Sequence, residues 1–427
     1  MWSSCTIATL RYCRAVCLVR PQAGVRHTAE VVHLLGGVAS PRTVRQRYPS
    51  RERVSTASGR HETACVIAVR APLTSVAPSV ATRTGSIVTS PSLDVAICTY
   101  NNAGQLAVTL AHLGRQRTSA DCAWRVLIVD NNCTDHTAEV IAEHRGRGAL
   151  PALDVVRQSE QGLTPARRMA VATSTADLVA FVDDDCRLAA DWVEQAWRFA
   201  GAHPAAGAFG GRVRLVGEAR PSALLDVHGW IFAAQAYTAA QRVVDGLVGA
   251  GLVVRRQALV DSGWLAEPLL ADRIGRRLVS GGDAEISLRL AAAGCKLWYT
   301  NALALEHFIP EARRSAAYLA RLAYGLGRSS VLVALLANPD WPTTERIIRQ
   351  REAKWRRTLA RRNPFELPLT VLAKAKTIEL GFLAGLRAGR RALSADTAAR
   401  RRLQGRAVPQ AARRDTVSGS ERPQPPG

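Results

Sequence analysis

The chain has 427 residues, of which 47% are hydrophobic, so it is long enough for one large domain with extensions or for two average domains. Its formal net charge of +22 lies at the ends: residues 1–91 carry 12 Lys and Arg against 3 Asp and Glu, residues 311–427 carry 24 against 9, and the middle carries 21 against 23. This charge distribution argues against a nucleic-acid-binding central domain. The nine cysteines do not have the spacing of zinc ligands. No run reaches the roughly 18 uninterrupted apolar residues of a membrane span.

The two ends of the chain differ from its middle. Residues 1–91 have no sustained helical or strand period and are rich in Ser, Thr, Arg and Pro, which predicts disorder or a start codon placed too early. The opening segment Met1–Arg20 lacks an apolar signal core, so we expect a cytoplasmic protein with reduced thiols. A second disordered tail is expected over residues 395–427.

From Asp94 onward, short apolar runs alternate with helical periods. Leu106, Leu110 and Leu113 have the spacing of one helix face. Strands that are apolar on both faces and alternate with helices predict a parallel sheet covered by helices, an α/β fold. The predicted strands are Val95–Cys98, Val126–Val129, Leu153–Val156 and Leu178–Val182. The expected helix caps are Asn101, Asn102, Asp135 and Thr164.

Three consecutive aspartates end the fourth predicted strand, at the edge where α/β folds bind ligands. Asp183, Asp184 and Asp185 repel one another unless a cation neutralises them. Mg²⁺ or Mn²⁺ prefers carboxylate oxygen and leaves positions open for phosphate, so the run predicts a metal-diphosphate site. A solvated acidic turn, or a set of caps for the helix that begins near Asp191, is the alternative.

Three further residues are candidates for function. Asp130 closes the second strand and can accept a hydrogen bond from a nucleobase or ribose, as any turn aspartate can. Asp283 follows two glycines in the first turn of a helix, where a carboxylate acts as a general base or as a simple cap. His307 follows the short strand Ala302–Leu305 and can complete a metal's coordination, although a lone histidine is usually not a ligand.

Taken in order, these segments resemble family 2 glycosyltransferases from about Leu93 to Ser330. The segments that carry the resemblance are Cys98–Asn101, Val129–Asp135, Gly162–Arg167, Phe181–Asp185, Gly282–Glu285 and Glu306–Pro310. The stretch Gly249–Gln257 is further similar to transferases of hormogonium-type polysaccharide synthesis, bacterial enzymes that build exported glycans.

The resemblance implies a GT-A fold, which is a Rossmann-like mixed sheet flanked by helices. It also implies a transfer, with inversion, of a sugar from a nucleotide-diphosphate donor to a glycan or lipid-linked acceptor. The donor of such enzymes is usually a UDP-sugar. Asp283 is then the catalytic base, and Arg167 offsets charge on the leaving diphosphate. The implied metal ligands for Mg²⁺ or Mn²⁺ are Asp183, Asp185 and His307. The implied donor-binding residues are Thr99, Tyr100, Asn101, Asp130, Gly162, Arg167, Asp183 and Asp184.

Two positions depart from the family pattern. Gly282 stands where relatives often carry Glu, which affects the acceptor side, and Arg168 stands where they often carry Asn, which affects contacts to the diphosphate. The Gln-x-x-Arg-Trp motif of processive synthases is absent, so we expect single additions. The alternatives are a nucleotidyltransferase of similar fold and a non-catalytic nucleotide-sugar-binding relative.

The expected domains are a catalytic domain over residues 92–330 and a basic helical extension over residues 331–394. The extension interleaves arginines such as Arg346, Arg356 and Arg357 with Trp341 and Trp355. Such a surface can lie on the anionic inner face of the cell membrane as a peripheral anchor, or it can be an ordinary solvated face.

Overall fold

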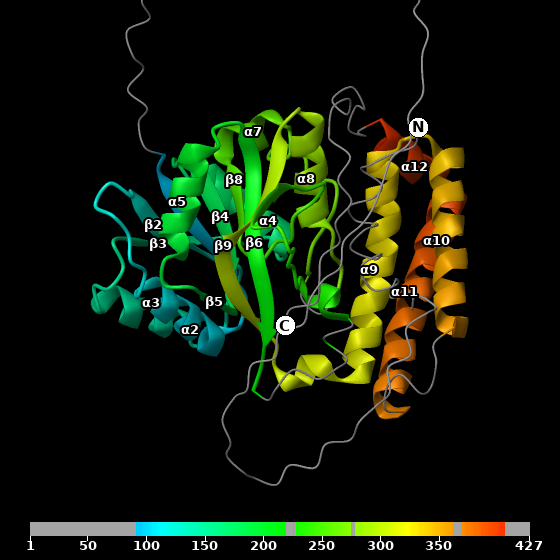
Figure 1. Cartoon of the computed structure of the whole chain (residues 1–427), viewed down its shortest axis with the longest axis horizontal. Coiled ribbons are helices and arrows are strands. Elements are labelled where there is room, and N and C mark those ends of the chain that lie inside the picture. Colours follow the sequence, from blue (N-terminus) through cyan, green and yellow to red (C-terminus); the bar gives the residue numbers. More distant parts are fainter. Residues whose placement is uncertain (1–90, 219–224, 226–227, 275–277, 362–368, 406–427) are drawn as a thin grey trace, which may run out of the picture. The chain divides into compact units, whose positions relative to one another are not determined.

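The structure is a computed structural model that describes residues 91–218, 225, 228–274, 278–361 and 369–405. The expectations for the N-terminal extension and for residues 406–427 lie outside the described residues, apart from Pro91. The described residues all belong to one compact unit (Figure 1).

One mixed sheet forms the centre of this unit (Figure 1). Its strands run in the order β3-β2-β1-β4-β8-β6-β9-β5, and β7 pairs with β9. The sheet confirms the predicted α/β fold with a mixed sheet, and it contains all four predicted strands. The bounds are β1 (Leu93–Thr99), β2 (Trp124–Asp130), β3 (Leu153–Arg157), β4 (Leu178–Asp183), β5 (Cys186–Leu188), β6 (Ala206–Val216), β7 (Gln241–Val243), β8 (Leu252–Arg255) and β9 (Lys296–Phe308).

Helices cover both faces of the sheet. Their bounds are α2 (Ala103–Leu113), α3 (Thr137–Gly146), α4 (Leu163–Thr173), α5 (Trp192–Ala202), α7 (Arg256–Asp261), α8 (Gly282–Ala292), α9 (Ala316–Ala337), α10 (Trp341–Arg361), α11 (Leu369–Ala395) and α12 (Thr397–Gln404). Two short 3-10 helices are η1 (Gly229–Phe232) and η2 (Glu311–Arg314).

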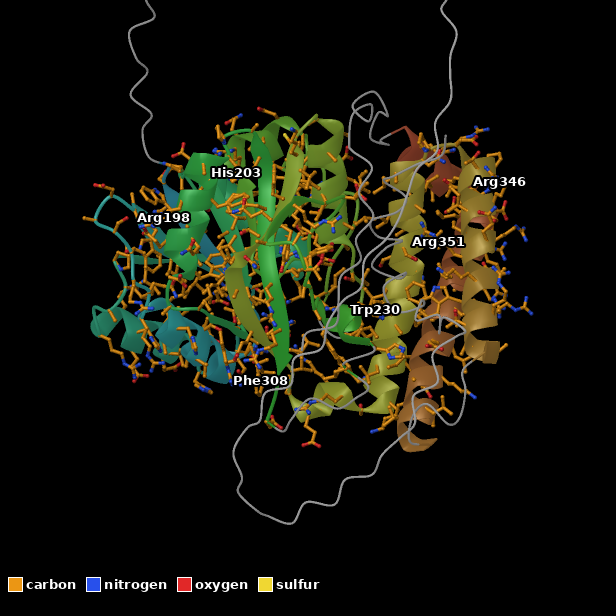
Figure 2. All side chains as sticks on the ribbon, in the orientation of Figure 1. Arg198, His203, Trp230, Phe308, Arg346 and Arg351 are labelled. Atoms are coloured by element: carbon orange, nitrogen blue, oxygen red, sulfur yellow. The ribbon has the colours of Figure 1, made fainter. Side chains whose placement is uncertain are left out.

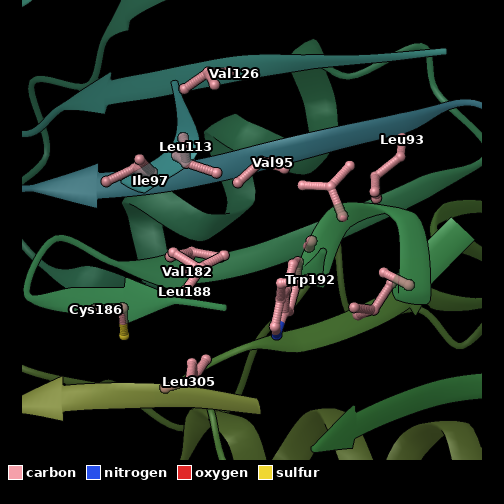
Figure 3. Close-up of a cluster of buried hydrophobic side chains, with 14 of the residues drawn as sticks. Leu93, Val95, Ile97, Leu113, Val126, Val182, Cys186, Leu188, Trp192 and Leu305 are labelled. Atoms are coloured by element: carbon pink, nitrogen blue, oxygen red, sulfur yellow. The ribbon is translucent and has the colours of Figure 1, made fainter. Parts of the chain in front are cut away.

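The strands β1 to β4 pair in parallel. β1, β2 and β4 are largely buried on both faces, whereas β3 lies at the edge of the sheet and is mostly exposed. Successive residues of β1 enter opposite cores: Val95 and Ile97 pack with α2 and α5, whereas Ala96 packs with α4 and α8. Figure 3 shows Val95 and Ile97 of β1 with Val126 of β2 and Trp192 of α5. This two-sided burial is why these strands read as continuous apolar runs rather than as alternating ones.

The predicted helix caps form different contacts from those expected. Asn102 lies at the N-cap position of α2 without a side-chain capping bond, and its Nδ2 donates to Asp184 instead. Asp135 does accept from Thr137 N at the start of α3, and it also accepts from Ala103 N of α2. Thr164 is wrong as a cap, because its hydroxyl bonds to the loop before α8.

A bundle formed by α9, α10 and α11 packs beside the sheet (Figure 1). Its core continues toward the sheet through η1, where Trp230 packs edge-on against Phe382 at 5.6 Å between ring centroids. His228 Nε2 lies 3.4 Å from Glu379 Oε1, and both side chains are 0% exposed. The predicted helical extension is therefore helical, and it shares one core with η1 and the end of the sheet.

Glycines set the close approach of α9 and α11. A Cβ on Gly381 or Gly385 would overlap the backbone of Ala320 or Tyr324 on the facing helix. The two helices run parallel at this contact, because the contacts advance along both chains together. The pairing fixes α11 against α9 without large side chains between them.

One expectation about the C-terminal region is corrected. Residues 397–404 form α12, whose first turn is capped by Asp396, so the described part of the expected tail is helical. Within the described residues, α9 is one helix long and apolar enough to cross a membrane by length and composition, and 61% of its apolar window is buried inside the protein. Arg321 and Arg328 divide its apolar stretch, so α9 contains no uninterrupted apolar run of the length of a membrane span.

Candidate functional site

The carboxyl ends of β1, β2 and β4 meet at one edge of the sheet. Thr99 pairs in register with Asp130, and Cys98 pairs with Asp183. The polar residues that end three separate runs of sequence are therefore neighbours across adjacent strands. This arrangement agrees with the edge that the parallel pattern predicts for a ligand.

Asp183 and Asp185 are the outer members of the acidic run, and ligand atoms of Asp183, Asp185 and Cys186 lie within 4.8 Å of one another. Cys186 belongs to the apolar core (Figure 3), and burial raises the pKa of its thiol well above the usual value. A buried neutral thiol is a poor ligand for a hard cation, so the two carboxylates are the relevant donors in this group.

His307 reaches the acidic run through strand pairing. It lies opposite Cys186 in the antiparallel pair of β5 and β9, and its Nε2 lies 3.2 Å from Asp185 Oδ1. Its Nδ1 lies 2.9 Å from the carbonyl oxygen of Phe232, which accepts a hydrogen bond and so places the proton on Nδ1. Nε2 is thereby directed at the carboxylates, the arrangement in which an imidazole serves as a metal ligand.

The donor set of Asp183, Asp185 and His307 fits a hard divalent cation. Burial alone would lower the pKa of His307, but the Asp185 carboxylate raises it to about 9. A proton and a metal ion are alternatives at the same Nε2 lone pair. Arg313 of η2, which sequence reasoning missed, also donates from Nη1 to Asp185 Oδ2 at 3.1 Å. No motif marks it, since it stands six residues beyond His307 in a separate turn.

Asp184 points to the other side of the strand end. Its carboxylate accepts from Thr99 Oγ1 and from Asn102 Nδ2, each at 2.7 Å. Burial and the neighbouring charge of Asp185 raise the pKa of Asp184 to about 7. In this structure Thr99 and Asp184 thus tie β4 to β1 and α2, and their contact with a donor stays a prediction.

Asparagine and aspartate side chains hold the loops after β1 and β2. Asn101 accepts from Thr134 N at 2.7 Å, and Asp130 accepts from Cys133 N at 2.8 Å, so both predicted donor-binding residues shape the loop after β2. Gly162, with φ +143°, donates from its backbone N to Asn131. The Tyr100 side chain is 45% exposed at the strand end.

Asn131 is a structural residue of the site that sequence reasoning missed. It is 3% exposed, and its Nδ2 donates to the carbonyls of Gln158 and Glu160 while its Oδ1 accepts from Gly162 N. It therefore fixes the loop between β3 and α4 against the end of β2. Its only signal in the sequence is the Asp-Asn-Asn turn, which any loop could carry.

Arg167 lies at the centre of the site and is 4% exposed. Its Nη2 lies 3.6 Å from Asp183 Oδ1, and its Nη1 donates to Asp272 Oδ2 at 3.2 Å. The guanidinium also lies over the Phe181 ring, 5.4 Å from its centroid. Asp272 was not predicted, because it lies in a loop with no motif around it.

Asp283 lies in the first turn of α8 on the other side of Arg167. Its carboxylate accepts from Gly249 N at 3.1 Å and from Ala284 N at 2.8 Å. Burial and the Asp272 charge raise the pKa of Asp283 to about 6, against the opposing effect of Arg167. A carboxylate of this kind is deprotonated at neutral pH yet basic enough to accept a proton.

Two residues of the matching motifs have supporting contacts instead of facing the site. Glu285, 1% exposed, accepts from Leu269 N and Leu270 N and so anchors the loop that carries Asp272. Arg168 donates from Nε to the carbonyl of Leu265 at 3.0 Å. The family departure at Arg168 thus serves the same loop.

Comparison with known proteins finds a family match for part of the chain. Residues 94–260 match the family described as glycosyl transferase family 2, a range that includes Asp130, Arg167 and all three aspartates and ends before Asp283 and His307. The chain is also 25% identical over 247 residues to the succinoglycan biosynthesis protein ExoM of Rhizobium meliloti (strain 1021), covering 56% of this chain and 73% of ExoM.

Two solved structures are similar as well. The mannosyltransferase PcManGT from Pyrobaculum calidifontis, in complex with GDP-Man and Mn²⁺, has a TM-score of 0.46 and 18% identity, with 71% of this chain and 88% of that chain covered. TarS of S. aureus, in complex with UDP-GlcNAc, has a TM-score of 0.42 and 14% identity, with 70% and 92% covered. The family match and the relative in sequence thus support a family 2 glycosyltransferase, with the matched domain over residues 94–260.

Proposed function

We propose that the protein transfers a sugar, with inversion, from a nucleotide-diphosphate donor to a hydroxyl of a glycan or lipid-linked acceptor in polysaccharide biosynthesis. The supporting observation is a line of charged groups in which Arg167 lies between Asp183 and the carboxylate of Asp272 beside Asp283. Transfer of this kind requires stabilisation of a departing diphosphate at one end and activation of a hydroxyl at the other.

Each end of this line has a chemical role in the proposal. Asp183, Asp185 and His307 would hold Mg²⁺ or Mn²⁺, which neutralises diphosphate charge when bound. Asp283 accepts the acceptor's hydroxyl proton as that oxygen forms its bond to the anomeric carbon and the bond to the diphosphate breaks. Arg167 stabilises the negative charge that leaves with the nucleotide.

The donor and the setting belong to the proposal too. Asp130 and the loop around Asn101 would receive the nucleoside, with a UDP-sugar as the first candidate. The name of the relative ExoM supports a polysaccharide product, and the Gly249–Gln257 stretch supports an enzyme of the hormogonium type in the cytoplasm.

A panel of nucleotide sugars, UDP- and GDP-linked, tests the proposal directly. Purified protein is assayed with Mg²⁺, with Mn²⁺ and with EDTA for donor binding by calorimetry and for donor hydrolysis. Asp185→Ala should abolish metal-dependent donor binding, whereas Asp283→Ala should retain binding and lose transfer. A folded protein that binds no nucleotide sugar would contradict the proposal, and normal transfer by Asp283→Ala would contradict the base assignment. Binding without any turnover would favour the non-catalytic alternative.

We also propose that the outer face of α10 contacts an anionic membrane, where lipid-linked acceptors reside. Arg346, Arg349, Arg356 and Arg357 are exposed along this helix, and Figure 2 shows Arg346 at its outer side. Removing α10 and α11 would be a poor test of membrane binding, because both helices share a core with η1 and α9. Replacing Arg349, Arg356 and Arg357 by Gln should lower pelleting with phosphatidylglycerol vesicles and leave phosphatidylcholine pelleting unchanged. Equal pelleting of parent and variant with both vesicles would contradict it.

A further inference from the structure

The start of α8 combines a missing side chain with a carboxylate from elsewhere in the chain. Gly282 is the first residue of the helix, and a Cβ built on it would overlap the carboxylate of Asp272. Asp272 comes from the loop ten residues earlier, and it is 5% exposed. The Asp272 carboxylate therefore occupies space that is free because Gly282 has no side chain.

Asp272 makes a separate contact with each of its oxygen atoms. Oδ1 accepts from Gly282 N at 3.0 Å, so it satisfies a backbone donor at the start of α8. Oδ2 accepts from Arg167 Nη1 at 3.2 Å. The backbone N of Asp272 donates to Thr164 Oγ1 at 3.0 Å, which ties the same residue to the first turn of α4. One side chain therefore connects α8, which carries Asp283, to α4, which carries Arg167.

The position of Arg167 depends on these contacts. Its guanidinium is confined on another side by Gly249, where a Cβ would lie 2.6 Å from Nη2. Gly249 N in turn donates to Asp283, so the two glycines leave room for a compact group of Arg167, Asp272 and Asp283. Without Asp272, the buried guanidinium would retain only the more distant Asp183 as an ion-pair partner among the described residues.

We propose that Asp272 is a positioning residue of the transfer site, and that it supplies from the preceding loop the carboxylate that relatives often carry at the position of Gly282. It holds Arg167 between the donor end and Asp283, and it sets the charge around Asp283. The charged groups that face Asp283 are Asp272 and Arg167. The expected effects on donor turnover rest on the proposed function. The steric exclusion between a side chain at position 282 and the Asp272 carboxylate does not.

Moving the carboxylate from position 272 to position 282 tests the inference. The variants are Asp272→Asn, Gly282→Glu alone, and Asp272→Gly combined with Gly282→Glu, with Asp261→Asn on the exposed end of α7 as the matched control. Gly282→Glu alone should lower the melting temperature, because the new side chain meets the Asp272 carboxylate. The combined variant should recover at least half of that loss and should exceed Gly282→Glu about tenfold or more in donor turnover.

The pH profile separates a positioning role from a purely structural one. Asp272→Asn keeps an oxygen for Gly282 N but removes the negative charge beside Asp283. The acid limb of donor turnover should then move to lower pH, by about 1 unit. An unshifted limb, together with a combined variant no better than Gly282→Glu in both melting temperature and turnover, would overturn the inference.

The outcomes for the two proposals are distinguishable. If the parent protein turns over no nucleotide sugar, the proposed function fails, and the melting temperatures still decide the steric part. If the parent is active and the swap gives no recovery in either measurement, the inference fails and the proposed function stands.

Discussion

The proposed donor end and the proposed acceptor end of the site are built in different ways. At the donor end, Asp183 and Asp185 follow one strand directly, and strand pairing places His307 beside them. At the acceptor end, Asp283 depends on Asp272 from a loop and on Arg167 from α4. The first arrangement follows from local sequence and sheet register, whereas the second exists only after distant segments have packed. A motif can therefore reveal one half of a site and leave the other half incomplete.

The largest effect is expected at the residue that joins the two ends. Arg167→Ala leaves the buried Asp272 carboxylate and the partly exposed Asp183 carboxylate without their shared cation, so we expect a loss of about 3–5 kcal/mol in the free energy of unfolding. Urea unfolding followed by circular dichroism measures it. Arg168→Ala is the control, because Arg168 bonds only to loop carbonyls and should cost about 1 kcal/mol. Equal losses for the two variants would mean that the two ends are not coupled through Arg167.

The donor end can be weakened separately through Asn131. Asn131→Ala removes buried hydrogen bonds to Gln158, Glu160 and Gly162, and should cost about 2–3 kcal/mol in unfolding free energy. Nucleotide affinity should fall as well, since the loop after β3 loses its anchor. Glu160→Ala is the matched control, because it keeps the carbonyl that Asn131 uses. An unchanged nucleotide affinity in Asn131→Ala would show that this loop is not part of the donor site.

Protonation of Asp283, at the proposed acceptor end, should determine how the transfer rate depends on pH. The pKa of Asp283 is raised to about 6, and the base acts only when deprotonated, so the rate at saturating metal and donor should be level above that pH. Below it, the rate should fall about tenfold for each pH unit as the carboxylate is protonated. Asp283→Asn should lack this limb at a low residual rate. Metal-dependent donor binding in the parent, measured across the same range, separates protonation of Asp283 from changes at the donor end.

Much of the parallel half of the fold could be predicted from sequence. β1, β2 and β4 are largely buried on both faces, so their composition alone identifies them, and α2 is marked by the spacing of three leucines. In the other half of the sheet, β8 pairs antiparallel with β4 and β6 while β6 pairs in parallel with β9, and the sequence predicts only the segment before His307. These strands exchange partners across long distances in the chain, and no local period encodes that pairing.

The site divides in the same manner. The sequence alone determined the chemistry that is available, because carboxylates at strand ends and a glycine-preceded aspartate at a helix start are local patterns. Only the tertiary structure decided which of these groups meet: it turned Asp184 toward α2, and it placed Asp272 where Gly282 has no side chain. The physical reason is that a buried charge must find its partner in space, and the partner's position in the sequence is unconstrained as long as the packed backbone brings the two together.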